Sequence, residues 1–245
     1  MRTARPGRAA PGDGHAGASA VRERLDPSMA VRRRMLLGAA AAPVGLAAAA
    51  AMAQEAGEGR LPAPQADGGL PLMQALTRRR TTRSFARQVL PPQVLSNLLW
   101  AAFGVNRPDG HRTAPSARNW QEIDIYVAMA SGAYVYDAKA HALQRVLPQD
   151  VRALAGTQAH ARNAPLTLVY VADARRMGGA SDEGRTELAA ADTGFIAQNA
   201  YLFCASEGLA TVVFASIDRE RLAQALKLDR AQRVVLAQSI GYPAQ

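Results

Sequence analysis

The chain lacks most of the features that identify a reactive side chain directly. Only one of its 245 residues is a cysteine, Cys204, which excludes an intramolecular disulfide and a site built from several thiolates. Aromatic residues make up 5%, few for the stacking of nucleic-acid bases. No glycine-rich nucleotide loop, His-Glu-x-x-His motif or Gly-x-Ser-x-Gly motif occurs. Any catalysis would therefore need a bound cofactor to supply the chemistry.

The histidines and acidic residues give no better starting point. His111, His141 and His160 do not have the spacing of metal ligands, and no pair of carboxylates stands out for acid–base catalysis. We therefore predict no metal site, and we expect the three histidines to lie on the surface or in loops. Cys204 falls within a helical apolar pattern, which predicts a buried thiol.

The net charge of +9 is unevenly distributed. Residues 1–53 carry eight arginines against three acidic residues, and the remainder carries 21 basic against 17 acidic residues. The excess of positive charge in residues 54–245 is small. Together with the few aromatic residues, it predicts that the protein does not bind nucleic acid. A hydrophobic content of 49% is typical of a globular protein with a buried core.

The N-terminal residues have the composition of a targeting segment. Residues 1–28 are rich in Arg, Ala, Gly and Pro without periodicity, which predicts a disordered leader, or an untranslated one if Met29 is the start. Residues 29–53 contain Arg32-Arg33-Arg34-Met35-Leu36, an alanine-rich run and the ending Ala51-Met52-Ala53.

This pattern resembles a twin-arginine export signal that is cleaved near Ala53. It predicts transient contact with the twin-arginine export machinery and a periplasmic or other extracytoplasmic location. A retained membrane anchor is the alternative. Residues 54–69, rich in Gly, Pro, Glu and Gln, then predict a linker, and residues 70–245 the folded domain.

Apolar periodicity divides the domain into helices and strands. Helices are expected at about 70–80, 91–103, 148–154, 186–207 and 218–226, and strands at about 123–129, 134–136, 143–147, 165–171, 210–215 and 233–240. The longest helix places Leu188, Ala191, Phe195, Asn199 and Leu202 on one side, suited to the core or to a subunit interface. Three consecutive strands followed by alternating strands and helices indicate an α+β or α/β sandwich around one sheet.

Two polar segments stand out. Residues 77–85 concentrate four arginines with hydroxyl groups, a combination suited to phosphate oxygens, although a solvated basic turn is the alternative. Residues 105–121 form a long loop that is dense in amide, hydroxyl and guanidinium groups and contains Trp120. Loops of this length within a compact domain are often functional.

Four segments, taken in order, resemble the flavin-dependent nitroreductase family, especially its branch related to azoline dehydrogenases. Residues 79–85 are similar to its Arg-Arg/His-Ser-x-Arg/Lys-x-Phe motif, residues 115–121 to its Pro-Ser-x-x-Asn-x-Gln loop, residues 192–199 to its long central helix, and residues 210–217 to the strand and loop beside the flavin. The resemblance implies an α+β, nitroreductase-like three-layer sandwich with a central, mostly antiparallel sheet flanked by helices.

The resemblance also implies an FMN site. Arg79 and Arg83 would bind the phosphate and the ring edge, with Arg80 and Thr81 beside them. Asn119 would contact the ring, flanked by Ser116 and Gln121. Ala215 and Ser216 would place catalytic backbone groups at flavin N5, where an N–H stabilises developing charge.

Two departures from the family pattern affect this site. No basic residue follows the last expected strand, so Arg79, Arg80, Arg83 or a partner subunit would bind the phosphate. Ala215 offers no acidic side chain near N5, which leaves the substrate class open.

The implied function is that of an exported FMN-dependent oxidoreductase. It would be a homodimer with FMN at the interface, and would transfer hydride or electrons by a ping-pong route to or from a nitroaromatic, a quinone, an enone or a similar small molecule. NAD(P)H is one electron donor to expect, and a membrane or protein donor is the other. The rival interpretations are a flavin-binding or flavin-modifying protein without NAD(P)H turnover, and a lipid-proximal structural protein with an uncleaved anchor.

Overall fold

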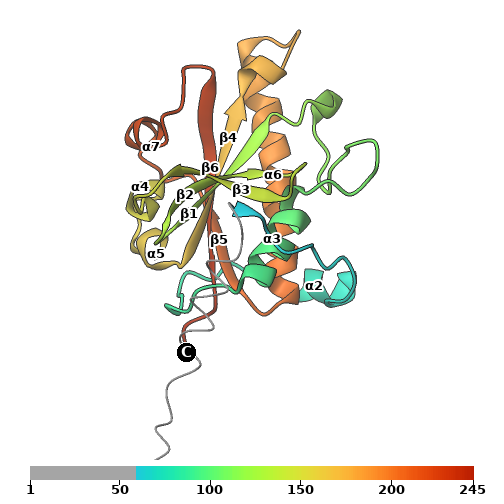
Figure 1. Cartoon of the computed structure of the whole chain (residues 1–245), viewed down its shortest axis with the longest axis vertical. Helices are drawn as coiled ribbons and strands as arrows, with labels where there is room; N and C mark the ends of the chain where they lie inside the picture. Colours follow the sequence, from blue (N-terminus) through green and yellow to red (C-terminus); the bar gives the residue numbers. More distant parts are fainter. Residues whose placement is uncertain (1–58) are drawn as a thin grey trace, which may run out of the picture. The chain divides into compact units, whose positions relative to one another are not determined.

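The computed structural model describes residues 59–245 (Figure 1). The predicted leader, the export signal and the first residues of the linker lie outside this range. Within the described range, no helix has both the length and the apolar character needed to cross a membrane.

A six-stranded sheet forms the centre of the domain. Its strands are β1 (Ile123–Met129), β2 (Gly132–Asp137), β3 (Ala142–Leu147), β4 (Leu166–Asp173), β5 (Ala210–Phe214) and β6 (Gln232–Gly241). They lie in the order β3-β2-β1-β4-β6-β5, and all neighbouring pairs are antiparallel. Strand β4 is buried along its whole length because both faces of the sheet are covered, which explains its continuous apolar sequence.

Helices cover both faces of the sheet (Figure 1). The larger core packs α3 (Pro92–Phe103) and α6 (Asp182–Ser206) against one face, and α2 (Leu72–Arg78) contacts α6. The second core includes residues from α4 (Arg152–Ala155), α5 (Ala159–Asn163) and α7 (Arg219–Ala225) on the other face. The predicted α+β sandwich with an antiparallel sheet is therefore confirmed.

Helix α6 is longer than predicted and buries a different side. It begins at Asp182 because the Ser181 side chain caps it by accepting from the Gly184 N–H at 3.2 Å. Its buried residues are Ala189, Asp192, Thr193, Ile196, Ala197, Ala200, Tyr201 and Cys204. The side that contains Phe195 faces away from the core, and Phe195 is 48% exposed. Helix α6 is still a core helix, as expected, and Leu188 packs against the larger core; alanines on all sides of the helix make its faces nearly equivalent.

The second half of the predicted linker packs on the domain. Arg60 forms a β-bridge with Ala142, and the Ser96 hydroxyl on α3 donates to the Pro62 carbonyl at 2.6 Å. His141, in the turn between β2 and β3, lies within hydrogen-bond distance of the Ser96 and Tyr136 hydroxyls. These contacts fix residues 60–65 along α3.

Candidate functional site

The basic segment 79–85 lies along the outer edge of β5. The Thr82 N–H donates to the Thr211 carbonyl at 2.9 Å, and the Thr81 hydroxyl lies 3.1 Å from the Tyr201 hydroxyl. The same Tyr201 oxygen accepts from the Val213 N–H at 2.9 Å. The backbone of the segment is therefore held in place along the sheet edge.

The arginines of this segment are the uncommitted cations of the domain edge. The Arg79 guanidinium lies 5.5 Å from the centroid of the Tyr201 ring, and Arg80 and Arg83 are exposed. None of these three takes part in the ion pairs or side-chain hydrogen bonds found among residues 59–245, whereas Arg152 and Arg175 do. Free guanidinium groups on a fixed backbone are suited to an anionic group such as a phosphate.

The loop after β5 leaves a backbone donor on the same edge. The Val213 N–H points outward to Tyr201, and Ala215 follows the end of β5, where continued strand alternation would turn its N–H to the same side. No acceptor for this N–H is found in the described part of the chain. The Ser216 carbonyl accepts from the Thr157 N–H at 3.0 Å, which fixes the loop to the residues before α5.

His160 on α5 connects the basic segment with the end of β5. It is only 9% exposed, and its ring lies edge-on to Phe214 with 5.2 Å between centroids. Burial, and then the positive charge of Arg83, lower the pKa of His160, so the imidazole is held neutral. Its Nε2 is buried and has no hydrogen-bond partner among the described residues. The prediction that His160 lies on the surface or in a loop was wrong.

The loop that contains Ser116, Asn119 and Gln121 forms a second, self-contained group. The Ser116 hydroxyl accepts from the Gln121 N–H at 3.0 Å, and the Gln121 amide donates to Asn119 Oδ1 at 3.0 Å. Arg118, Asn119 and Gln121 have φ of 49°, 54° and 49°. Left-handed backbone at three non-glycine residues is costly and clusters at functional sites.

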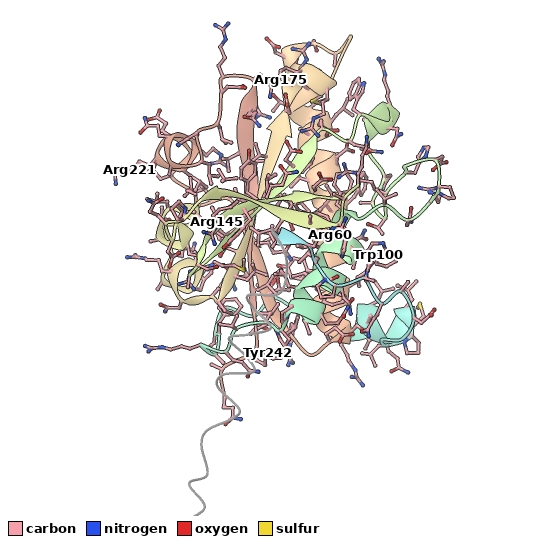
Figure 2. The ribbon with its side chains drawn as sticks, in the orientation of Figure 1. Arg60, Trp100, Arg145, Arg175, Arg221 and Tyr242 are labelled. Carbon is pink, nitrogen blue, oxygen red and sulfur yellow. The ribbon has the colours of Figure 1, made fainter. Side chains whose placement is uncertain are left out.

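The two groups lie apart within one chain. The Ala117 N–H donates to Asp192 on α6 at 2.8 Å, whereas Thr81 pairs with Tyr201, nine residues along the same helix and so about 13 Å away. Figure 2 shows the corresponding ends of the sheet, with Arg175 near the start of β1 and Tyr242 next to the segment 79–85. The structure therefore brings Arg79, Arg80, Thr81, Arg83, Ala215 and Ser216 to one edge, and Ser116, Asn119 and Gln121 to another place.

Residues 76–242 match the family model that is described as "Nitroreductase family". The chain belongs to the nitroreductase family. By family and fold it is an oxidoreductase.

Three known proteins illustrate this relationship. A Methanocaldococcus jannaschii protein named as a nitroreductase is 30% identical over 167 residues, 64% of this chain and 84% of that protein. The crystal structure of a nitroreductase from Ralstonia eutropha JMP134 has a TM-score of 0.74 at 43% identity and covers 76% of this chain and 90% of that chain. The NADPH:FMN oxidoreductase of Vibrio harveyi, solved with NAD+, shares the fold with a TM-score of 0.54 at 21% identity, over 71% of this chain and 69% of that chain.

Sequence reasoning missed three residues at the β5 edge. Tyr201 and Thr157 fix the backbone of β5 and of the following loop, and His160 presents the unpartnered nitrogen. The short helix α5 has too few residues for an apolar period, so no sequence signal marks the position of His160. Between Gly59 and Gln245, no cluster of three His, Cys, Asp or Glu side chains suited to a metal ion is found.

Proposed function

We propose that this nitroreductase-family chain is an FMN-dependent oxidoreductase that uses the β5 edge as its cofactor site. The observation that carries the proposal is the gathering of unsatisfied polar groups there. Three free guanidinium groups, the outward Ala215 N–H and the buried Nε2 of His160 all belong to this edge.

These groups fit the chemistry of FMN. Arg79, Arg80 and the Thr81 hydroxyl would hold the phosphate and the ribityl oxygens by charge-assisted hydrogen bonds. Arg83 and the neutral His160 would hold the polar edge of the ring. FMN, when bound, accepts an electron pair from one partner and passes it to another.

The residues of the chain would contribute position and electrostatics to this transfer. The Ala215 N–H is a fixed donor where charge develops, and the Thr157–Ser216 hydrogen bond keeps this loop in place. Phe214 and Tyr201 are buried beside it and limit the access of water. No acidic side chain is offered by Ala215, so a proton would come from the substrate side or from solvent.

A homodimer is part of the proposal. Leu72 (63% exposed), Met73 (72%) and Leu76 (44%) leave an apolar side of α2 uncovered, and Phe195 does the same on α6. A second copy over these helices would bury this surface and could bring the Ser116–Gln121 loop of one chain to the β5 edge of the other. This arrangement would explain why the two groups are separate within a single chain.

The electron donor and the cell compartment follow from different arguments. The Vibrio harveyi neighbour is an NADPH:FMN oxidoreductase, which supports NAD(P)H as the donor. Export through a twin-arginine signal remains our proposal from residues 29–53, and would favour a membrane or protein donor. Nitroaromatics, quinones and enones are the acceptors to test first.

The test is to purify residues 54–245 and to record the absorbance near about 450 nm, where a bound flavin absorbs. We expect a yellow protein that oxidises NADPH or NADH in the presence of a quinone or a nitroaromatic. A colourless protein that takes up no added FMN would contradict the cofactor assignment. Bound FMN without turnover with any donor would favour the alternative, a flavin-binding or flavin-modifying protein on the same fold.

A further inference from the structure

A buried carboxyl pair lies beneath the strained loop. Glu122 directly follows Gln121 and has no exposed surface, and Asp192 on α6 is 3% exposed. Both carboxyl oxygens of Glu122 lack a hydrogen-bond partner among the described residues. Asp192, by contrast, accepts the Ala117 N–H at 2.8 Å. An ionised carboxylate without partners is costly to bury, so burial favours the protonated form of Glu122.

The charged groups around Glu122 do not neutralise it. Asp192 approaches from α6 and Arg176 from the 3₁₀ turn Ala174–Arg176 after β4. Arg176 donates instead to the Gln121 carbonyl, at 2.6 Å, and to Asp124, with Asp173 at 3.8 Å. Arg112 donates to the Gln121 side chain at 2.8 Å. Burial, and then the charge of Asp192, raise the pKa of Glu122 to about 7.

A hydrogen bond and the backbone connect the Glu122–Asp192 pair with the Ser116–Gln121 loop. Asp192 holds Ala117 at one end of the turn, and the backbone joins Glu122 to Gln121 at the other end. Between these points the chain is in the left-handed conformation at Arg118, Asn119 and Gln121. A strained segment persists only while its surroundings hold it, so it is the part that yields when the support weakens.

We propose that Glu122 is a positioning residue, which as a neutral acid lets Asp192 hold the Ser116–Gln121 loop and which releases the loop when it ionises. Two carboxylates in one buried site repel each other, and movement of the loop admits water to relieve the repulsion. The effect on catalysis, through Ser116 and Asn119, rests on the proposed function. The response of the loop to pH does not.

Trp120 provides a reporter within the loop. Its ring is partly buried and lies 5.3 Å from the Arg118 guanidinium, so a movement of the loop changes its surroundings. We expect its fluorescence in flavin-free protein to show a transition with a midpoint near pH 7. Glu122→Gln, which cannot ionise, should abolish the transition. Asp192→Asn keeps an oxygen for the Ala117 N–H but removes the like charge, and should move the midpoint to lower pH.

Matched variants identify the source of the signal. Trp120→Phe removes the reporter and should remove the transition, whereas His111→Gln replaces the histidine of the same loop and should leave the transition unchanged. Amide hydrogen exchange of residues 115–122 at pH 8 should be slower in Glu122→Gln than in the natural chain.

A transition that persists in Glu122→Gln would overturn the proposal, as would the absence of a transition in the folded natural chain. If Glu122→Gln does not fold, the shift of the midpoint in Asp192→Asn decides. Because no flavin is present in these measurements, their failure is distinct from a failure of the proposed function.

Discussion

The β5 edge and the Ser116–Gln121 loop are both rich in polar groups, yet they use them in opposite ways. At the edge, the side chains of Arg79, Arg80 and Arg83 form no ion pair or hydrogen bond among residues 59–245, and the backbone beneath them is regular. In the loop, the Gln121 side chain donates to Asn119, the Gln121 backbone N–H donates to the Ser116 hydroxyl, and the backbone is strained. Our proposals rest on this difference: exposed cations on a rigid support suit the binding of an anionic ligand, whereas a strained loop held by hydrogen bonds suits control of its position.

The largest effect should be on FMN affinity, when arginines at the β5 edge are removed. The double substitution Arg79→Ala with Arg83→Ala removes two charge-assisted contacts, each worth roughly 1.5–3 kcal/mol, so FMN affinity should fall by about 100-fold or more. The measurement is a fluorescence titration of FMN. Arg78→Ala is the matched control, because Arg78 is exposed at the end of α2 and outside the motif. Equal affinity in all three proteins would refute the phosphate role of the edge.

The ionisation of Glu122, beneath the Ser116–Gln121 loop, should make the free energy of unfolding depend on pH. The pKa of Glu122 is raised to about 7 in the folded chain from its usual 4.5, so the folded state binds more protons between these values. The free energy of unfolding should therefore fall as pH rises from 4.5 to 7, by on the order of 2–3 kcal/mol, and should then level off. Urea unfolding at pH 5 and pH 8 measures this.

The same measurement on Glu122→Gln gives the comparison. This variant should lose much less stability over that interval, because its side chain is neutral at both pH values. A parallel loss in both proteins would show that other groups carry the pH dependence.

Substitution of His160 tests whether the proposed FMN site at the β5 edge includes a residue other than the arginines. His160→Phe keeps an aromatic ring against Phe214 but removes the unpartnered Nε2, so FMN affinity should fall by about tenfold while the fold remains. An unchanged affinity at equal thermal stability would limit His160 to packing.

The smallest effect should come from loss of the Tyr201 hydroxyl, which holds the backbone at the β5 edge. Tyr201→Phe removes the acceptor of the Val213 N–H and the partner of Thr81, and should cost about 1 kcal/mol of stability. FMN affinity should fall only slightly, because the cations remain. A loss of affinity as large as that of the double arginine variant would show that the position of the segment matters more than its charge.

The sequence alone predicted most elements because their signals are local. The continuous apolar run of β4, the alternation in β1 and the proline start of α3 each act over a few residues, and the structure confirms all three. The motifs at 79–85 and 115–121 also pointed to the family through short spacing. The roles of the individual residues in FMN binding stay predictions.

Only the tertiary structure decided which polar groups meet. It selected the buried side of α6, where alanines leave the periodicity undecided, and it inserted β6 between β4 and β5. It also buried His160 against Phe214, and Glu122 near Asp192, 70 residues later in the chain. Whether a side chain is buried, unpartnered or neutral depends on segments that are distant in sequence, so the sequence determined the framework and the fold determined the chemical state of the site.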